Sequence, residues 1–305
     1  MVTKNILVLG GSGAIGQSLI KNIKENFKVS VFDMKKLNKS LNKNVKFYKG
    51  NCYKEKDIKK IPRNIDIVIF LLGYKGGPDS LKLKLYHKYF KNNCESLYKF
   101  LEKNKIKKLK KIIFASTEHV YGDNSIVKND LLKKEVMPKN FYGSTKLFAE
   151  KILYNFWLKK KISIDILRLP RIILNNKNLI SKMIYNAKFK KKIIIKKTKA
   201  KFNFLHIDDL LGAINKSIFQ LKSKYRILNI YNDSDALTLK DIAKHIRSAL
   251  KSKVKIDYFK YNNFVEHNPI NLSISNKDTK KQLMWKPKIS NRKIIEKLVK
   301  INEVN

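Results

Sequence analysis

The stretch Gly10-Gly11-Ser12-Gly13-Ala14-Ile15-Gly16 follows an apolar run from Asn5 to Leu9 and precedes a helical pattern with apolar residues at Leu19, Ile20 and Ile23. Glycine permits a tight turn and a close approach of the backbone to a pyrophosphate. The free N–H groups and the positive dipole end of the following helix attract the charge of that pyrophosphate. The order of strand, glycine-rich turn and helix therefore predicts a dinucleotide-binding turn.

A carboxylate ends the next apolar run. Val29–Phe32 is followed by Asp33, which lies 23 residues beyond Gly10. Close to this spacing, a carboxylate accepts hydrogen bonds from the ribose hydroxyls of adenosine. The same charge repels a 2′-phosphate, so the sequence favours NAD as the cofactor over NADP. Lys35 and Lys36 weaken this discrimination.

Short apolar runs alternate with amphipathic stretches along the first half of the chain. This alternation is typical of βαβ units around a parallel sheet that is buried on both faces. We therefore expect an α/β fold, a Rossmann-type doubly wound parallel sheet, with a smaller C-terminal α/β portion. The expected strands are Asn5–Leu9, Val29–Phe32, Val45–Tyr48, Ile65–Leu72, Lys111–Ala115 and Ile164–Leu169, with Ile227–Tyr231 as a later addition.

The 305-residue chain is strongly basic. Its 68 Lys and Arg residues against 24 Asp and Glu residues give a formal net charge of +44, which raises the question of a nucleic-acid partner. Only six of the basic residues are Arg, the residue that reads nucleic acid bidentately, and the Lys residues are spread over the whole length. AT-rich codon usage explains the abundance of Lys, so we do not expect a nucleic-acid partner. The hydrophobic content of 43% excludes a disordered chain.

The cysteines and the apolar runs indicate the compartment. Cys52 and Cys94 show neither metal-type nor redox spacing, which fits a reducing cytoplasm. The longest apolar stretch, Ile65–Gly73, is broken by Asp66 and is far shorter than the roughly 20 residues that cross a bilayer. The N-terminus lacks the layout of a signal peptide. We expect a cytoplasmic protein with no membrane span.

A second group of polar residues carries candidate chemistry. Ser116 and Thr117 end an expected strand, and Tyr142 and Lys146 follow at a spacing that puts both on one face of a helix. A nearby ammonium and a cationic nicotinamide ring stabilise a phenolate and lower a phenol pKa that is ordinarily about 10. Tyr142 can then take a proton from a substrate alcohol while Thr117 holds the same oxygen. We predict Thr117, Tyr142 and Lys146 as catalytic residues.

These motifs together resemble those of the extended short-chain dehydrogenase/reductases of the NAD-dependent epimerase/dehydratase family, which modify nucleotide sugars. The resemblance covers nearly the whole chain. Its further pieces are Asn93, Ser116–Gly122, Leu167–Arg171, Phe204–Leu210 and Leu283–Pro287.

The resemblance implies which residues contact NAD. Asn51 and Cys52 would approach the adenine, Leu72 and Gly73 the dinucleotide, and Lys146 the nicotinamide ribose. Asn51 stands where an Asp is usual in the family. The implied cofactor-binding residues are Gly10, Gly13, Ala14, Ile15, Gly16, Asp33, Asn51, Cys52, Leu72, Gly73, Asn93, Tyr142, Lys146 and Pro170.

The resemblance also implies the domain organisation. Residues 1–170 would form the NAD-binding domain, rejoined by segments at about 204–231, and residues 171–203 and 232–305 would form the substrate-binding portion. Relatives usually pair through a four-helix interface, which implies a homodimer built on the helices that contain Asn93 and Tyr142.

The substrate half departs from the family pattern. Relatives commonly offer an Arg to the diphosphate of a nucleotide sugar at the place where Phe202 stands here, and Lys199 or Lys201 could substitute as a point charge. Glu118 and His119 occupy the places of an Asp-Glu acid/base pair in the family's 4,6-dehydratases. They could move protons beside a 4-ketone, or merely line the cleft.

The segment His206–Asp209 could suggest a metal site. The resemblance instead assigns its His206, Asp208 and Asp209 to the orientation of a strand end and the following helix. We predict no metal.

The expected activity is that of an NAD-dependent nucleotide-sugar epimerase/dehydratase that works through a 4-keto-sugar intermediate, with a 4-epimerase as the leading expectation. A nucleotide-sugar 4,6-dehydratase or a 4-keto-sugar reductase would use the same residues and stays open. From another class, a non-catalytic dinucleotide-binding module with an anionic partner also stays open. The intact Thr117, Tyr142 and Lys146 argue against that module, because a pure sensor has no need of them.

Overall fold

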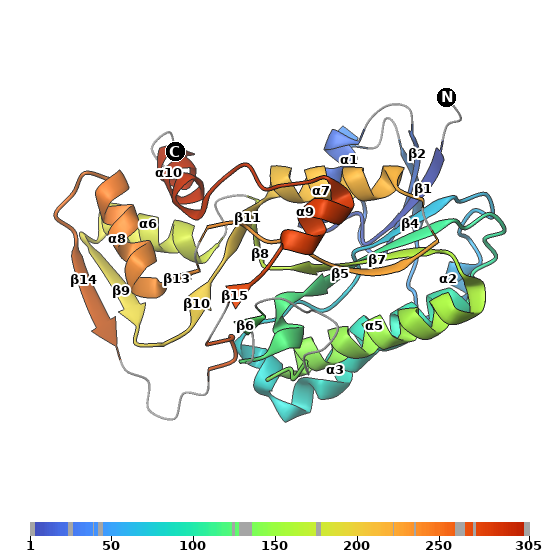
Figure 1. Cartoon of the computed structure of the whole chain (residues 1–305), viewed down its shortest axis with the longest axis horizontal. Coiled ribbons are helices and arrows are strands. Elements are labelled where there is room, and N and C mark those ends of the chain that lie inside the picture. Colours follow the sequence, from blue (N-terminus) through green and yellow to red (C-terminus); the bar gives the residue numbers. More distant parts are fainter. Residues whose placement is uncertain are drawn as a thin grey trace.

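The computed structural model contains one large parallel sheet with helices on both faces and a smaller cluster of helices and strands beside it (Figure 1). It describes residues 4–23, 27–38, 40–41, 45–123, 126–127, 136–174, 178–221, 223–234, 236–259, 266–270 and 273–301. The strands are β1 (Lys4–Leu9), β2 (Phe27–Asp33), β3 (Val45–Lys49), β4 (Ile67–Phe70), β5 (Lys111–Thr117), β6 (Ile126–Val127), β7 (Ser163–Leu169), β8 (Arg171–Ile173), β9 (Lys192–Lys196), β10 (Lys201–Phe202), β11 (Phe204–His206), β12 (Tyr225–Asn229), β13 (Leu237–Thr238), β14 (Lys255–Phe259) and β15 (Ser273–Ile274). The helices are α1 (Ala14–Asn22), α2 (Glu55–Ile58), α3 (Tyr86–Phe90), α4 (Ser96–Lys103), α5 (Phe141–Lys160), α6 (Leu179–Phe189), α7 (Ile207–Phe219), α8 (Leu239–Ala249), α9 (Lys277–Leu283) and α10 (Asn291–Ile301). Short 3-10 turns are η2 (Pro78–Leu81), η3 (Leu83–Leu85) and η5 (Glu118–Tyr121), and a π-helical turn, η4 (Lys91–Glu95), joins α3 to α4.

The seven strands of the central sheet run parallel in the order β12-β7-β5-β4-β1-β2-β3. Each of the seven runs expected from the sequence forms one of these strands, and the ends shift by at most two residues. The strand order reverses between β1 and β4, and open α/β sheets bind ligands at the carboxyl ends of the strands at such a point. The expected Rossmann-type α/β fold is confirmed.

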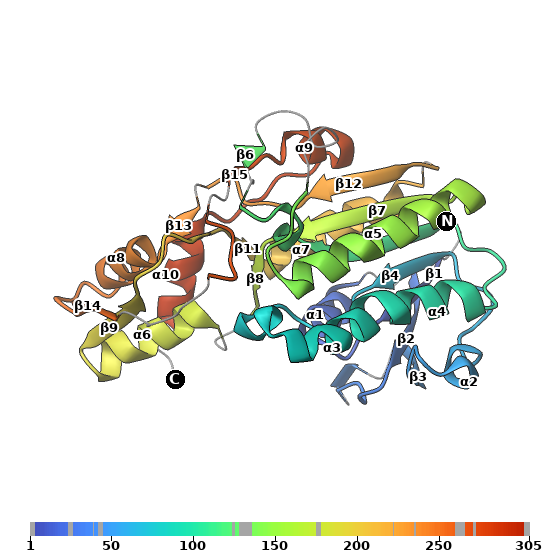
Figure 2. The same ribbon diagram turned by 90° about the horizontal axis from the view of Figure 1, so that it is seen from below.

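Helices cover both faces of this sheet. Helices α1 and α7 lie on one face, and α3, α4 and α5 lie on the other (Figures 1 and 2). Because successive side chains of a strand point to opposite faces, Ile6 and Val8 of β1 join the core under α1 and α7, whereas Leu7 and Leu9 join the core under α4 and α5. Burial on both faces explains why these strands are nearly continuous apolar runs.

A second hydrophobic core lies beside the sheet, in the part of Figure 1 that contains α6, α8 and α10. Strand β9 pairs there with β14, and its Ile193 and Ile195 are buried in this core while Ile194 is exposed. Helix α7 and strand β12 belong instead to the first core and the first sheet. The boundaries of the two domains stay a prediction.

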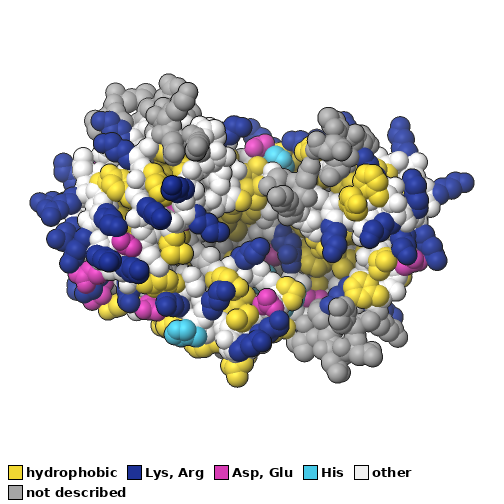
Figure 3. Space-filling model, turned by 180° about the vertical axis from the view of Figure 1, so that it is seen from behind, with side chains coloured by type: hydrophobic (Ala, Val, Ile, Leu, Met, Phe, Trp, Pro, Cys, Tyr) yellow, Lys and Arg dark blue, Asp and Glu magenta, His cyan; other side chains and the backbone are white. Residues whose placement is uncertain are grey.

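Basic side chains are distributed over the surface. On the face drawn in Figure 3, Lys and Arg residues appear across the whole width rather than in one stripe. Among the described helices, none combines the length and the apolar character that crossing a bilayer requires.

A buried charge cluster joins β5, β7, β12 and α7. Asp165 and Lys111 both have 0% exposed side chains, and their Oδ2 and Nζ atoms are 2.7 Å apart. Arg226 donates to both carboxylate oxygens, at 2.7 and 2.6 Å, and Ser217 donates to Oδ2 at 2.6 Å. Burial lowers the pKa of Lys111, and the charge of Asp165 opposes that shift. Three strands and a helix therefore depend on one carboxylate.

We predict that Asp165→Asn lowers the free energy of unfolding by about 3–5 kcal/mol, because it leaves the buried Lys111 ammonium without its counter-charge. Urea unfolding measures the loss. The matched control is Asp257→Asn, which removes a partner of Lys255, a side chain that is 78% exposed. That control should change stability by less than about 0.5 kcal/mol. Equal losses in the two variants would contradict a structural role for the Asp165 cluster.

Candidate active site

The glycine-rich turn joins β1 to α1 where the strand order reverses. Gly10 has a φ of +86°, and a Cβ on it would lie 2.9 Å from the backbone nitrogen of Leu72. A Cβ on Gly16 would lie 2.6 Å from the carbonyl oxygen of Gly10. No side chain fits at either position, while Gly13 and Ala14 are exposed at the amino end of α1. The turn therefore offers bare backbone and a helix N-terminus to a ligand.

Asp33 lies at the rim of this turn. Its Oδ2 accepts the N–H of Ser12 at 3.0 Å, and its Oδ1 accepts the N–H of Lys35 at 3.0 Å. The carboxylate is partly exposed, so it keeps lone pairs for hydroxyl donors. An open glycine cradle with an adjacent carboxylate fits the pyrophosphate and the adenosine ribose of NAD.

Other predicted cofactor residues line up along the same edge of the sheet. A Cβ on Gly73 would lie 2.8 Å from Asn93 Oδ1 and 3.1 Å from Lys146 Nζ. Asn93 Oδ1 accepts the N–H of Tyr74 at 2.7 Å, and its Nδ2 donates to Thr145 Oγ1 at 2.9 Å. Asn93 therefore joins the loop after β4 to α5.

Asn51 and Cys52 follow β3 at this edge. Burial, followed by the nearby charge of Asp33, raises the pKa of the Cys52 thiol to about 12. The backbone N–H of Asn51 donates to Asp57 at 3.0 Å. Leu72 lies against Gly10, and Pro170 follows β7 and borders the cavity described below. Which of these residues contact NAD stays a prediction.

Helix α5 presents Tyr142, Lys146 and Glu150 at four-residue intervals. Glu150 forms a buried bidentate ion pair with Arg168 of β7, in which Nη2 lies 2.6 Å from Oε2 and Nε lies 3.1 Å from Oε1. The hydroxyl of Ser116, at the end of β5, also donates to Glu150. This anchoring sets the rotation of α5 about its axis, so Tyr142 and Lys146 face the carboxyl ends of β4 and β5.

Tyr142 lies beside Thr117, as the sequence predicts. Burial raises the pKa of the Tyr142 phenol, the hydrogen bond with Thr117 lowers it, and the charge of Glu118 raises it. Thr117 is itself buried, and its Oγ1 also accepts the N–H of His119 at 3.3 Å. The two hydroxyl groups can therefore address one substrate oxygen.

The position of Lys146 corrects part of the sequence-based argument. Its Nζ donates to the carbonyl of Ala115 at 2.8 Å and lies 4.7 Å from the centre of the Phe114 ring. Burial lowers the pKa of Lys146 to about 8, and the charge of Glu150 opposes that shift. We expected its ammonium to lower the pKa of Tyr142, but the hydroxyl of Thr117 has that effect in this structure. The reason is that Nζ turns toward the end of β5 and the Gly73 loop.

Glu118 and His119 both border the cavity, in η5. Burial raises the pKa of Glu118 to about 7, although the hydrogen bond from the Tyr231 hydroxyl and the charge of Arg171 lower it. Burial, with the charges of Arg171 and His267, lowers the pKa of His119 to about 3. Asn140 accepts the N–H of Gly143 through Oδ1, so its Nδ2 donates to His119 Nδ1 at 3.0 Å. At neutral pH His119 is therefore uncharged and carries its proton on Nε2.

These side chains surround one cavity of about 420 Å³ at the carboxyl edge of the sheet. One wall comes from the strand ends and α5, and the other comes from the segments that follow β7 and from residues 267–268. Lys199 and Lys201 are exposed and do not border it. The lining residues are Lys75, Gly76, Gly77, Thr117, Glu118, His119, Tyr142, Leu169, Pro170, Arg171, Ile172, Ile173, Asn178, Leu179, Ile180, Phe204, His267 and Asn268.

Sequence reasoning missed three polar groups of this cavity. Arg171 stands two residues after the end of β7, a position that the strand-end rule could have singled out. His267 and Asn268 carried no local signal, because they reach the cavity from a segment almost 100 residues further along the chain.

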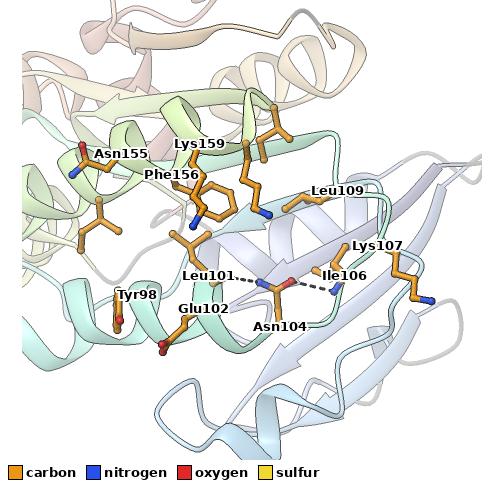
Figure 4. Close-up of a pocket in the computed structure, with 13 residues that line it drawn as sticks. Tyr98, Leu101, Glu102, Asn104, Ile106, Lys107, Leu109, Asn155, Phe156 and Lys159 are labelled. Atoms are coloured by element: carbon orange, nitrogen blue, oxygen red, sulfur yellow. Dashed lines mark hydrogen bonds between the residues drawn. The ribbon is translucent and has the colours of Figure 1, made fainter.

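A second cavity, of about 790 Å³, lies at the opposite edge of the sheet (Figure 4). It lies between the carboxyl ends of α4 and α5, next to Ile106 and Leu109, which precede β5. Figure 4 shows that its walls carry the side chains of Leu101 and Phe156 and the amide of Asn104. It lies away from the predicted catalytic residues.

The segment His206–Asp209 has a structural role. His206 accepts the N–H of Asp208 and caps α7, and the carboxylate of Asp209 accepts the N–H groups of Lys288 and Ile289 at 2.9 and 3.1 Å. Within the described ranges, no group of three or more His, Cys, Asp or Glu side chains is arranged to hold a metal ion.

Comparison with known proteins relates this chain to sugar-nucleotide enzymes. The sequence model of the NAD dependent epimerase/dehydratase family matches residues 6–230. The chain is 32% identical to the dTDP-D-glucose 4,6-dehydratase of Dictyostelium discoideum over 273 residues, 80% of this chain and 61% of that protein. It is 32% identical to the UDP-glucose 4-epimerase of Lactobacillus helveticus over 155 residues, 48% of this chain and 46% of that protein. The matches thus span about half to three fifths of these relatives.

A solved structure has the same fold. The UDP-glucuronic acid 4-epimerase from Bacillus cereus, in complex with UDP-glucuronic acid and NAD, superposes with a TM-score of 0.85 at 21% identity, covering 99% of this chain and 100% of that one. The resemblance inferred from the motifs is therefore confirmed, together with the expectation of an NAD-dependent enzyme.

We predict a pH dependence of stability from Glu118. Its pKa rises on folding from 4.5 to about 7, so folded protein binds the proton more tightly than unfolded protein between these values. Stability from this group is complete below about pH 4.5 and is lost as the pH rises through about 7. The free energy of unfolding of wild type minus that of Glu118→Gln should fall by about 3 kcal/mol over this range.

Urea unfolding at pH values from 4 to 8 checks this prediction. The subtraction removes the contribution of His119, which both proteins share. A difference that stays constant with pH would show that Glu118 titrates normally.

Proposed function

Because the chain belongs to the NAD-dependent epimerase/dehydratase family, we propose that it oxidises C4 of a nucleotide-activated sugar and returns the 4-keto sugar as the C4 epimer. The observation that carries the proposal is the placement of Tyr142 and Thr117 together in a cavity at the carboxyl edge of the sheet, beside the glycine-rich turn. A hydroxyl pair at this place suits an alcohol substrate.

The residues that would hold NAD are the exposed turn at Gly13 and Ala14, the carboxylate of Asp33, and Lys146 beside Gly73. When bound, NAD supplies an acceptor and donor of hydride for the sugar C4. Nothing else in the proposed chemistry requires a group that the chain does not itself provide.

Tyr142 takes the proton of the C4 hydroxyl, and it returns a proton to the carbonyl oxygen when the alcohol is formed again. Thr117 hydrogen-bonds the same oxygen and stabilises the phenolate form of Tyr142. Lys146 joins α5 to the end of β5 through its bond to the carbonyl of Ala115, and its Nζ lies close to Gly73.

The state of His119 favours epimerisation over dehydration. Removal of water across C5 and C6 needs one group that takes a proton and another that gives one. His119 is a weak base in this site because its pKa is about 3 and its Nδ1 already accepts a hydrogen bond from Asn140. Of the pair Glu118 and His119, only Glu118 then titrates near neutral pH. One titrating group fits a 4-epimerase better than a dehydratase.

A 4,6-dehydratase is the second candidate, since Glu118 has a pKa of about 7 and the Dictyostelium relative bears that name. A single Glu118 would then have to exchange protons at both carbons. A 4-keto-sugar reductase uses the same Tyr142 and Thr117 on a substrate that is already oxidised.

We also propose a homodimer that buries α4 and α5. Both helices expose large apolar side chains, since Tyr98, Phe148, Tyr154 and Leu158 are 51, 51, 40 and 45% exposed. Burial of such a patch between two copies would stabilise the pair. A cytoplasmic location is consistent with the two cysteines, which are both buried and free.

We predict that Tyr142→Phe lowers kcat by about 10²-fold to 10⁴-fold, because the variant loses the group that accepts the proton. Its affinity for NAD, measured by calorimetry, should stay within about twofold. Tyr258→Phe is the matched control, since Tyr258 is 52% exposed on β14, away from the cavity, and this variant should keep wild-type activity. Full activity of Tyr142→Phe would overturn the proposal.

A pH profile separates the role of Thr117 from a packing role. Thr117→Val should shift the limb of the pH–rate profile that reports Tyr142 to higher pH, because the hydrogen bond that lowers this pKa is lost. Thr117→Ser keeps the hydroxyl and should keep the profile.

The product identifies the reaction. The protein with NAD is incubated with UDP-, dTDP-, GDP- and CDP-hexoses, and the products are followed by mass spectrometry and anomeric proton NMR. We expect a product of unchanged mass with inverted C4. Loss of water would assign the dehydratase, and turnover only of a 4-keto sugar with reduced cofactor would assign the reductase. NAD binding without turnover of any of these would favour a non-catalytic module.

A further inference from the structure

Arg171 contributes a cation to the wall of the catalytic cavity. It is the first residue of β8, and its guanidinium lies over the ring of Phe202, 4.9 Å from the ring centre. Its Nη2 donates to the side-chain oxygen of Asn268. Its Nε is buried and has no hydrogen-bond partner among the described residues. The guanidinium therefore keeps a buried donor that the described residues leave without a partner.

The two nearby carboxylates interact with the charge of Arg171 but form no close ion pair with it in the described part of the chain. Glu266 accepts the N–H and the Nδ2 of Asn268 on Oε1, at 3.0 and 2.7 Å, and the hydroxyl of Thr198 bonds to its Oε2 at 2.5 Å. Glu118 accepts the hydroxyl of Tyr231. Neither carboxylate forms an ion pair with Arg171 within 4.0 Å in the described part of the chain.

Two neighbouring side chains hold the planar guanidinium of Arg171 in place. Phe202 supports one face of the guanidinium, and Asn268, itself fixed by Glu266, orients one edge. A cation that is removed from water without a directly paired counter-charge is costly, so such groups are usually completed by a partner. Arg171 lines the cavity that also contains Tyr142 and Thr117.

We propose that Arg171 binds an oxyanion of the substrate in this cavity, either the diphosphate of the nucleotide sugar or a carboxylate carried by the sugar itself. The inference rests on the proposed function and narrows its substrate class. A guanidinium presents parallel N–H donors that match the oxygen pairs of phosphate and carboxylate. The exposed Lys199 and Lys201 lie outside the cavity, so they do not provide this contact.

The placement of Arg171 also explains a gap in the sequence. Phe202 stands where an arginine for the diphosphate was expected, and the guanidinium of Arg171 packs on that very ring. The charge thus reaches the same region from β8 instead of β10.

Calorimetric titration with NAD present tests the inference with defined probes: UDP, UDP-glucose and UDP-glucuronate, or the dTDP series if the wild type binds that base. Arg171→Gln removes the charge. Arg171→Lys keeps the charge but lacks the parallel N–H donors of the guanidinium. We expect Arg171→Gln to weaken binding of the oxyanion probe by about 10-fold to 100-fold, with a smaller loss for Arg171→Lys. Arg292→Gln, which alters an exposed pair with Glu296 on α10, should bind every probe like the wild type.

The probes distinguish the two sources of the oxyanion. Weaker binding of UDP, UDP-glucose and UDP-glucuronate alike assigns the diphosphate. A loss confined to UDP-glucuronate assigns a sugar carboxylate. Wild-type affinity of Arg171→Gln for all three overturns the inference, while turnover of a nucleotide sugar by the same protein would leave the proposed function standing. Failure of the wild type to bind or turn over any nucleotide sugar would overturn both.

A second variant tests the inference even if Arg171→Gln does not fold. Asn268→Asp puts a carboxylate against the guanidinium, although it also loses the hydrogen bond that Asn268 Nδ2 donates to Glu266. Because the new carboxylate pairs with Arg171, we expect the same probes to bind at least about 10-fold more weakly. In steady-state kinetics the loss should appear mainly in KM, and NAD affinity should not change. Unchanged probe affinity in folded Asn268→Asp would also contradict the inference.

Discussion

The ion pair between Glu150 and Arg168 is the constraint on which the site depends. Both side chains are buried, at 2% and 3% exposure, and two hydrogen bonds join them. The two charges must stay paired, because either charge alone in this buried position would be strongly unfavourable. The pair locks α5 to β7, and the Ser116 hydroxyl locks the same carboxylate to β5. The face of α5 that carries Tyr142 has therefore one available orientation.

The topology of the sheet does the rest of the positioning. The reversal between β1 and β4 leaves room above their carboxyl ends, and the turn at Gly10 packs against Leu72 across that gap. The next strand outward, β5, ends at Thr117, so the hydroxyl that meets Tyr142 is one strand away from the cofactor turn. The residues predicted to bind the cofactor and those predicted to transfer protons share one edge because all seven strands are parallel.

Local pattern was enough to predict the parts of the fold and site that are encoded locally. The glycine turn, Asp33 and the seven strands follow from apolar runs and spacing, and the Tyr142–Lys146 pair follows from helical periodicity. The direction of Lys146 did not follow, since it is set by a carbonyl on β5. Arg171 follows a strand end, but its contact with Asn268 forms only in three dimensions, 97 residues apart, so no local pattern predicts that pair.

Burial, rather than the net charge of +44, controls the ionisation of the cavity. It raises the pKa of Tyr142 and Glu118 and lowers the pKa of Lys146 and His119, so each group shifts toward its uncharged form. The many surface lysines act through water, where charges are screened within about 8 Å at physiological salt. Cations that border the cavity interact more strongly with a substrate there. Lys75 and Arg171 both line it, and Lys75 is exposed whereas Arg171 has a buried Nε without a partner among the described residues. An anionic ligand that compensates the charge of Arg171 would at the same time remove water from the phenol of Tyr142.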